Sequence, residues 1–180
     1  MTQGSLLHRF EISLADVDRG RYEELDLRVA QHASESGTFL LTRVLAFCLE
    51  HAEGIAFSSG GVSSDEPAVA VRGPDGILRA WIEVGWPSPE RLHRAAKSAP
   101  RVAVYAHKDL DGFVERLAGA RIHRAAEIAV RGFEPRFLAG LERRLERRVR
   151  WQLSVVDGSV FLAADGEGLA SPVVERRIGS

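Results

Sequence analysis

The sequence predicts a mixed α/β (α+β) fold, and three observations support this prediction. First, the strand-like segment Leu78–Gly85, the amphipathic segment Pro89–Ser98 and the apolar run Arg101–Ala106 follow one another closely. A strand, a helix and a strand at this spacing are typical of a right-handed parallel crossover. Second, apolar and polar residues alternate near both ends of the chain, which predicts further strands. Third, residues 37–52 repeat apolar side chains at helical spacing.

The N-terminal part predicts two strands and a helix. Ser5–Leu14 and Leu25–His32 each alternate apolar with polar residues, so they form a candidate hairpin whose strands can also pair elsewhere. Ser34 is a candidate N-cap for the helix that follows, and Gly54 is a candidate residue for its end. Cys48 lies on the apolar face of this helix and is expected to pack there as a small apolar residue.

The middle of the chain predicts three more strands before the crossover. Ile55–Ser58 is a short strand candidate, and Ser58–Ser64 is a loop rich in glycine and serine. Ala68–Arg72 and Leu78–Gly85 are expected to form a hairpin, because the sequence Gly73–Gly76 between them is a strong turn signal. The predicted order around the crossover is therefore helix, three strands, helix, strand.

The C-terminal part predicts two helices and three strands. The helices are expected over Leu110–Ala118 and Pro135–Arg148, and a strand is expected between them over Ile122–Ala126. Val149–Val156 and Val160–Ala164 alternate apolar and polar residues and predict a closing hairpin.

The length and composition favour one domain spanning residues 1–180. The chain has 180 residues, of which 45% are apolar and 27% charged, as in ordinary globular proteins. The net charge of −1 provides no bulk attraction for nucleic acid or for an acidic membrane. Cys48 is the only cysteine, which excludes an intrachain disulfide. The N-terminal residues lack a signal-peptide pattern and no apolar run is long enough to span a bilayer, so we expect a cytoplasmic protein with no membrane partner.

Four acidic residues are the candidates for chemistry, because the common phosphate-loop, dinucleotide and serine-nucleophile motifs are absent. Glu83 lies on a predicted central strand, Asp65 and Glu66 precede the neighbouring strand, and Glu35 precedes the first helix. Carboxylates are the ligands that Mg²⁺ prefers, and the ion would polarise a phosphate and generate hydroxide. Glu83 with Asp65 or Glu66 is the predicted metal site. Alternatively, Asp65 and Glu66 are simply solvated loop residues.

An arginine-rich segment is the candidate for nucleic-acid contact. Arg143, Arg144, Arg147 and Arg148 lie close together in the sequence and could meet a phosphate backbone. The alternative is a charged, solvent-exposed helix face, since glutamates are interleaved with these arginines.

The chain resembles the YaeQ family of bacterial proteins along nearly its whole length. The segments that carry the resemblance are Ile12–Asp18, His32–Glu35, Arg43–Leu49, Asp65–Pro67, Trp81–Gly85, Arg101–Tyr105 and Asp157–Gly158. Family members look like the PD-(D/E)XK, or restriction-endonuclease-like, superfamily. That resemblance implies a mixed sheet flanked by helices with the order αβββαβ.

The superfamily resemblance also implies site residues. Its motif has an aspartate after a proline, then an acid, any residue and a lysine on the next strand. Glu83 matches the acid. Ala68 follows Pro67 where the aspartate is expected, Gly85 occupies the lysine position, and Trp86 replaces a family glutamine. Trp86 is expected to seal or pack the pocket, with base stacking as the alternative.

The resemblance implies a nuclease-like protein that has lost most of its catalytic machinery and acts by binding nucleic acid or a protein partner. The alternative is an active Mg²⁺-dependent nuclease that uses Glu83, Glu35 and Asp65 or Glu66 to hydrolyse phosphodiesters. A third hypothesis is an interaction module in which the acidic pocket is a relic. No cofactor is expected unless the nuclease is active.

Overall fold

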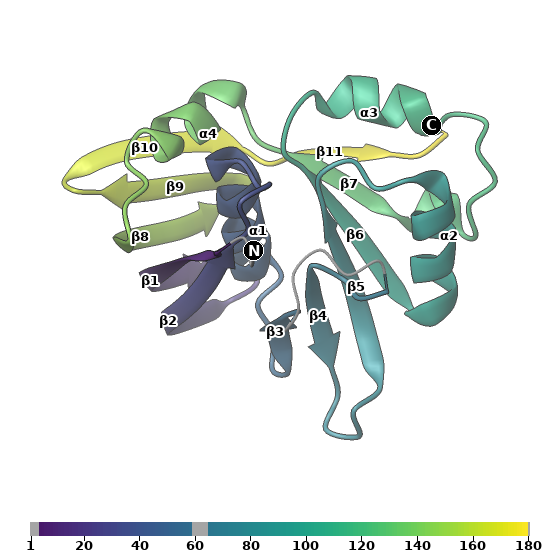
Figure 1. The fold of residues 1–180 in the computed structure, drawn as a ribbon, viewed down its shortest axis with the longest axis horizontal. Helices are drawn as coiled ribbons and strands as arrows, with labels where there is room; N and C mark the ends of the chain where they lie inside the picture. The colour runs from purple at the N-terminus through teal and green to yellow at the C-terminus, as the bar shows by residue number, and fades with distance from the viewer. Residues whose placement is uncertain (1–3, 59–64, 180) are drawn as a thin grey trace. The chain divides into compact units, whose positions relative to one another are not determined.

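The computed structural model describes residues 4–58 and 65–179, and the chain folds into two compact units (Figure 1). Unit 1 is Met1–Leu41 with Phe133–Val173, and unit 2 is Thr42–Gly132 with Val174–Ser180. Neither unit is therefore one continuous half of the chain. The expectation of a single domain over residues 1–180 stays a prediction. The predicted loop Ser58–Ser64 lies, from residue 59 on, outside the described residues.

Unit 1 contains a five-stranded sheet built from both ends of the chain. Its strands, in sheet order, are β10 (Glu167–Pro172), β9 (Ser159–Ala164), β8 (Arg148–Val156), β1 (Leu6–Asp16) and β2 (Arg21–Gln31). The predicted N- and C-terminal hairpins are confirmed as β1–β2 and β8–β9. In addition, β1 pairs with β8 in parallel and joins the two hairpins into one sheet. A lone hairpin is marginal in water, and this pairing covers one open edge of each hairpin.

One face of the unit 1 sheet forms a core. On β1, Phe10, Ile12 and Leu14 are buried, while the residues between them are at least partly exposed. Phe10 meets Trp151 of β8 edge-to-face, with their ring centroids 5.1 Å apart. The helix α4 (Pro135–Glu142) packs against β10 and buries its own apolar side chains.

Unit 2 contains a six-stranded mixed sheet. In sheet order its strands are β11 (Val174–Arg177), β7 (Ala129–Gly132), β6 (Arg101–Ala106), β5 (Leu78–Val84), β4 (Val69–Arg72) and β3 (Ile55–Phe57). β5, β6 and β7 are parallel, and the outer pairs are antiparallel. The chain runs through α1 (Gly37–Leu49), β3, β4, β5, α2 (Pro89–Ser98) and β6, which is the predicted order.

The central strands of unit 2 present different chemistry on their two faces. Val102 and Val104 of β6 join Leu92 of α2 and Phe113 of α3 (Leu110–Leu117) in an apolar cluster. Arg101 and Tyr105 of the same strand point to the opposite face, because successive side chains of a strand alternate. The side of the sheet under α2 and α3 is thus mainly apolar around these residues, and the other side carries Arg101 and Tyr105.

Two predicted elements are wrong in extent or kind. The helix expected over Pro135–Arg148 ends at Glu142, because the alternating, half-buried pattern that follows draws the chain into β8 from Arg148 on. The strand expected over Ile122–Ala126 is absent. Residues Ala125–Glu127 form a 3-10 turn instead, and the strand begins at Ala129, where the buried apolar residues lie.

The first helix begins two residues later than expected. Its cap is Ser36, whose hydroxyl oxygen accepts a hydrogen bond from the Phe39 N–H at 3.1 Å, and not Ser34. Cys48 is fully buried in this helix, as expected.

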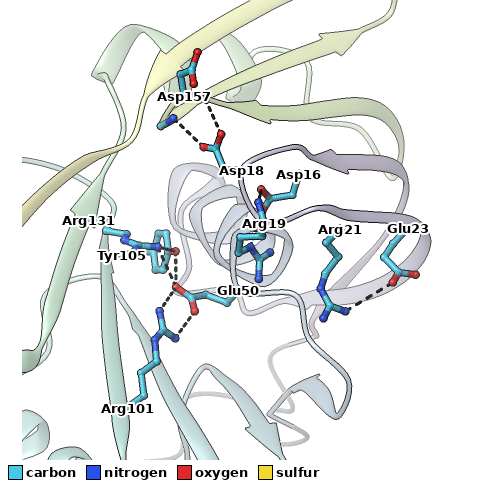
Figure 2. A network of polar contacts seen from close by, with 11 residues as sticks. Asp16, Asp18, Arg19, Arg21, Glu23, Glu50, Arg101, Tyr105, Arg131 and Asp157 are labelled. Carbon is cyan, nitrogen blue, oxygen red and sulfur yellow. Dashed lines mark hydrogen bonds and ion pairs between the residues drawn. The ribbon is translucent and has the colours of Figure 1, made fainter.

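Asp16, the last residue of β1, and Asp18, two residues later, accept hydrogen bonds that stabilise turns of unit 1 (Figure 2). The Asp18 carboxylate accepts hydrogen bonds from the backbone N–H groups of Asp157 at 2.7 Å and Gly158 at 2.9 Å. The buried Asp16 carboxylate accepts from the Arg19 Nε at 2.6 Å. The Asp18 contact connects the β1–β2 turn to the β8–β9 turn, so this acidic motif has a structural role.

The change Asp18→Ala is expected to destabilise the protein by about 1–3 kcal/mol, because two N–H groups lose a charged acceptor. Urea unfolding followed by circular dichroism measures this difference. Glu146→Ala removes an exposed acid of the same unit and is expected to change the free energy of unfolding by less than about 0.5 kcal/mol. Equal effects of the two variants would contradict the role assigned to Asp18.

Candidate functional site

Glu83 is a buried carboxylate on β5. It is 4% exposed and shares the α2-facing side of the strand with Trp81, two residues before it. The strand is central, because β4 and β6 pair with its two edges. Burial of the flanking Ile82 and Val84 explains why the sequence forms a strand here and why the acid cannot turn to solvent.

The Glu83 carboxylate is occupied by protein donors. Arg91 of α2 donates its Nε–H to Glu83 Oε1 at 2.8 Å, and the indole N–H of Trp81 donates to the same oxygen. The Arg91 guanidinium also lies 5.8 Å from the centre of the Trp81 ring. Ser88 caps the first turn of α2 and so fixes the part of the helix that carries Arg91.

The other two predicted metal ligands, Asp65 and Glu66, also accept hydrogen bonds from arginines of α2. Arg91 donates through Nη2 to the backbone carbonyl of Glu66 at 2.6 Å. Arg94, one turn further along α2, donates through Nη1 to Asp65 Oδ1 at 3.2 Å. Asp65, Glu66 and Glu83 therefore lie near the same part of α2. They contact two arginines, Arg91 and Arg94.

Burial raises the pKa of Glu83 above its ordinary range, and the hydrogen bond from Trp81 and the charge of Arg91 only partly oppose this effect. A carboxyl with a raised pKa is a weaker ligand for a hard cation at neutral pH than an exposed carboxylate. Among residues 4–58 and 65–179, no three histidine, cysteine or acidic side chains gather as a metal site. The Mg²⁺ site of Glu83, Asp65 and Glu66 stays a prediction.

Glu35, the remaining predicted catalytic residue, belongs to unit 1, whereas Glu83 belongs to unit 2. Its backbone carbonyl accepts a hydrogen bond from the Gln31 side-chain amide at 3.1 Å, and its N–H donates to the His32 carbonyl at 2.9 Å. These local contacts fix the loop before α1. The catalytic assignment of Glu35 also stays a prediction.

The two positions after Val84 have backbone and packing roles. Gly85 has φ = +94°, a conformation that glycine adopts far more readily than other residues. Trp86 stacks on Phe113, with ring centroids 5.6 Å apart, and its indole N–H donates to the Lys108 carbonyl at 3.0 Å. The Lys108 and Arg116 side chains lie over the Trp86 ring. Trp86 is thus packed against α3, and its role in sealing a pocket stays a prediction.

A second buried glutamate, which the sequence analysis missed, lies on the opposite face of the unit 2 sheet (Figure 2). Glu50 follows α1 and is 6% exposed. Arg101 donates to both of its carboxylate oxygens, and the Tyr105 hydroxyl donates to Oε1 at 2.7 Å. Arg131 of β7 donates to Glu50 Oε1 at 3.3 Å and, through Nε, to Glu175 of β11 at 2.9 Å.

The network shifts the pKa values of its members. Burial alone would raise the pKa of Glu50, but the hydrogen bonds and charges of Arg101, Tyr105 and Arg131 outweigh burial and lower it. The pKa of Tyr105 is raised, chiefly by burial and also by the Glu50 charge. The only sequence signal was that Arg101 and Tyr105 are spaced to lie on one face of a strand. Glu50 itself looked like an ordinary residue near a helix end.

The arginines proposed for nucleic-acid contact do not share a helix face. Arg143 and Arg144 follow α4, Arg147 precedes β8, and Arg148 begins that strand. Arg144 donates to the Gly140 carbonyl at 2.8 Å and pairs with Glu167. Arg143 and Arg147 are exposed, whereas Arg148 lies on the sheet and contacts Glu11 at 3.2 Å. Their contact with nucleic acid stays a prediction.

Comparison with known proteins identifies the family. The family model described as YaeQ protein matches residues 1–172. The chain belongs to the YaeQ family. A crystal structure of YaeQ protein from Xanthomonas axonopodis pv. citri superposes with a TM-score of 0.86, at 27% identity, over 96% of this chain and 98% of that one. The YaeQ structure from Pseudomonas syringae gives a TM-score of 0.85 at 26% identity, with 97% of each chain covered.

The YaeQ relatives with curated sequences are bacterial and of uncharacterized function. The Salmonella typhi protein is 26% identical over 164 residues, 91% of each chain. The Escherichia coli K12 protein is 24% identical over 170 residues, 94% of each chain. Both are described as uncharacterized protein YaeQ. The mixed α+β fold is thus shared with solved YaeQ structures, while the relatives carry no activity over to this chain.

The helices also bear on membrane insertion. Within the described part of the chain, none is long and apolar enough to cross a bilayer.

The two buried glutamates are expected to respond oppositely to pH, since the pKa of Glu50 is lowered and that of Glu83 is raised. Glu50 contributes stability above the unfolded-state pKa of about 4.3, and this contribution is lost as pH falls through the lower folded-state pKa. Glu83 costs stability as pH rises from the unfolded-state pKa through the higher folded-state pKa. Urea unfolding of wild type, Glu50→Gln and Glu83→Gln from about pH 4 to about pH 7 separates the two effects.

At pH 7 we expect Glu50→Gln to lose about 2 kcal/mol, and the loss to shrink toward pH 4. We expect Glu83→Gln to stay within about 1 kcal/mol of wild type or to exceed it, with its relative stability rising as pH increases. Each variant serves as the control for the other. The same pH slope in both would contradict the opposite pKa shifts.

Proposed function

We propose that this YaeQ protein is a degenerate nuclease-fold protein that acts by binding nucleic acid or a protein partner and does not cut. The observation that supports this proposal is the occupation of Glu83 by Arg91 and Trp81. A nuclease needs its strand carboxylate free to hold a hydrated cation. In this protein the Arg91 guanidinium occupies the place of the cation and supplies a permanent positive charge next to the Glu83 carboxylate.

The assignment to the restriction-endonuclease-like superfamily belongs to the same proposal. It is supported by the chain order α1, β3, β4, β5, α2, β6 and by the central position of Glu83 on β5. Within that superfamily, the lysine after the acid stabilises charge on the phosphate. Gly85 stands at this position with φ = +94°, where a lysine would be strained. The backbone conformation at this position therefore favours the glycine that is present over a lysine.

The change Gly85→Lys, which would restore the superfamily motif, is expected to destabilise the protein by about 1–2 kcal/mol and to restore no cleavage. The reason is the positive φ at this buried position. Thermal unfolding measures the destabilisation. Gly168→Lys, at an exposed position of β10 where an added Cβ meets nothing within 4 Å, is the control and is expected to be close to wild type. A Gly85→Lys variant as stable as this control would contradict the strain.

Cleavage itself is tested with single- and double-stranded DNA and RNA in Mg²⁺ or Mn²⁺. We expect wild type to release no more product than Glu83→Ala, because the acid is engaged by Arg91. Glu90→Ala, an exposed change on α2 next to Arg91, is the control for contaminating nuclease in the preparation. Metal-dependent cleavage that Glu83→Ala abolishes and Glu90→Ala keeps would overturn the proposal. It would establish instead the alternative, an Mg²⁺-dependent nuclease that uses Glu83.

A further inference from the structure

The strand β2 is an open edge of the unit 1 sheet (Figure 1). It is the last strand in the sheet order, and β1 is the only described strand that pairs with it. The two strands pair without a break in register from Leu6 opposite Gln31 to Asp16 opposite Arg21. β2 contains no proline, lysine or bulge, features with which proteins commonly protect an exposed edge. A regular edge of this kind can pair with another strand.

Alternate residues of β2 direct their backbone groups to this edge. The Arg9 N–H donates to the carbonyl of Arg147, at the start of β8, at 2.8 Å. The odd-numbered residues of β1 therefore direct their backbone groups to β8, and the even-numbered residues, such as Phe10, direct theirs to β2. Phe10 lies opposite Leu27, so Leu27 directs its backbone groups to β1. The residues on either side of Leu27 direct theirs to the open edge.

The charges beside the open edge are self-complementary about Leu27. Asp26 precedes this residue and Arg28 follows it, and both are exposed on the face opposite the core. A second copy of β2 that pairs antiparallel, with Leu27 opposite Leu27, would place each Asp26 opposite the Arg28 of the other copy. Opposite charges that face each other across two strands stabilise the pairing.

Within one chain the same two side chains face like charges. Arg28 lies opposite Arg9, and Asp26 lies opposite Glu11. Arg9 reduces this repulsion by pairing diagonally with Asp26, with 2.7 Å between Arg9 Nη2 and Asp26 Oδ2. A second copy would place a charge of opposite sign on the other side of both Asp26 and Arg28.

The core face of β2 matches in the same register. Leu25 and Leu27 are only partly buried, although they share a face with the fully buried Phe10 and Ile12. With Leu27 opposite Leu27, each Leu25 would lie opposite Val29 of the other copy. The pairing would therefore remove apolar surface from water, which favours association.

The charges exclude the adjacent registers. A pairing centred on Asp26 places two aspartates opposite each other, and one centred on Arg28 places two arginines opposite each other. A pairing centred on Leu25 places Glu24 opposite Asp26 twice. Like charges directly opposite destabilise a sheet. The pattern therefore selects the register centred on Leu27.

We infer that β2 pairs antiparallel with β2 of a second copy of this chain, so that two five-stranded sheets join into one across a two-fold axis at Leu27. An unrelated strand would need the same alternation of acid, leucine and arginine, whereas a second copy always carries it. The pairing involves one edge only, so association is expected to be reversible and concentration-dependent. It goes beyond the proposed function, because it needs neither nucleic acid nor cleavage.

Sedimentation velocity of the full chain from about 1 to about 500 μM tests this inference, and wild type is expected to shift from monomer toward dimer. Asp26→Arg would face Arg28, and Arg28→Asp would face Asp26, so each variant alone is expected to associate about tenfold more weakly or less. In an equimolar mixture of the two variants every arginine faces an aspartate. The mixture is expected to associate like wild type, which a misfolded variant could not do.

A cysteine crosslink tests the register. The Cα atoms of a facing pair that exchanges no hydrogen bonds lie about 4.5 Å apart, a separation that a disulfide can span. Leu27→Cys is therefore expected to form a disulfide-linked dimer on mild oxidation. Leu25→Cys is the matched control and is expected not to, because it faces Val29. The native Cys48 is buried and is not expected to react.

Arg136→Asp reverses an exposed charge on α4 and is the control for net charge, expected to associate like wild type. A wild type that stays monomeric over the whole range would overturn the inference, as would a mixture of charge variants that fails to associate. Association that neither charge variant weakens, or equal crosslinking of the two cysteine variants, would also overturn it. None of these outcomes affects the proposed function, whereas metal-dependent cleavage would overturn that function alone.

Discussion

A carboxylate buried against a β-sheet has to be paired, because removing an isolated charge from water costs far more than a domain's net stability. The six-stranded sheet of unit 2 contains one such group on each face. Glu50 is paired with Arg101 and Arg131 on one side, and Glu83 with Arg91 on the other. These pairs connect the helices to the sheet, and β11 to β7 through Glu175. The same constraint decides whether Glu83 is available for chemistry.

The opposite pKa shifts of the two glutamates follow from the number of their donors. Glu50 has two guanidinium groups and a phenol, which together outweigh the effect of burial. Glu83 has one guanidinium and an indole, which do not. Perturbed pKa values of this kind occur both at functional sites and in structural ion-pair networks. The arginine that contacts Glu83 comes from α2, the helix directly after the strand.

The two units differ in where their charged side chains lie. Unit 2 buries two carboxylates, Glu50 and Glu83, and each is paired with arginine beside the sheet. Unit 1 holds its charged groups on an open sheet face, next to two exposed aromatic rings. Polar groups that are buried and satisfied rigidify a fold, whereas exposed ones remain available to a ligand.

The sequence by itself determined the local elements and the family. The hairpins, α1, α2, α3 and the crossover follow from hydrophobic periodicity, which depends only on neighbouring residues, and Glu83 was found because it interrupts an apolar strand. Long-range pairing decided the rest. Period-two burial in β8 ended α4 early, and the parallel β1–β8 register created a second sheet and aligned Arg9 with Arg148. The arginine partners of Glu50 and Glu83 come from residues 8 to 81 positions away, and no pattern in a short window encodes which charge meets which.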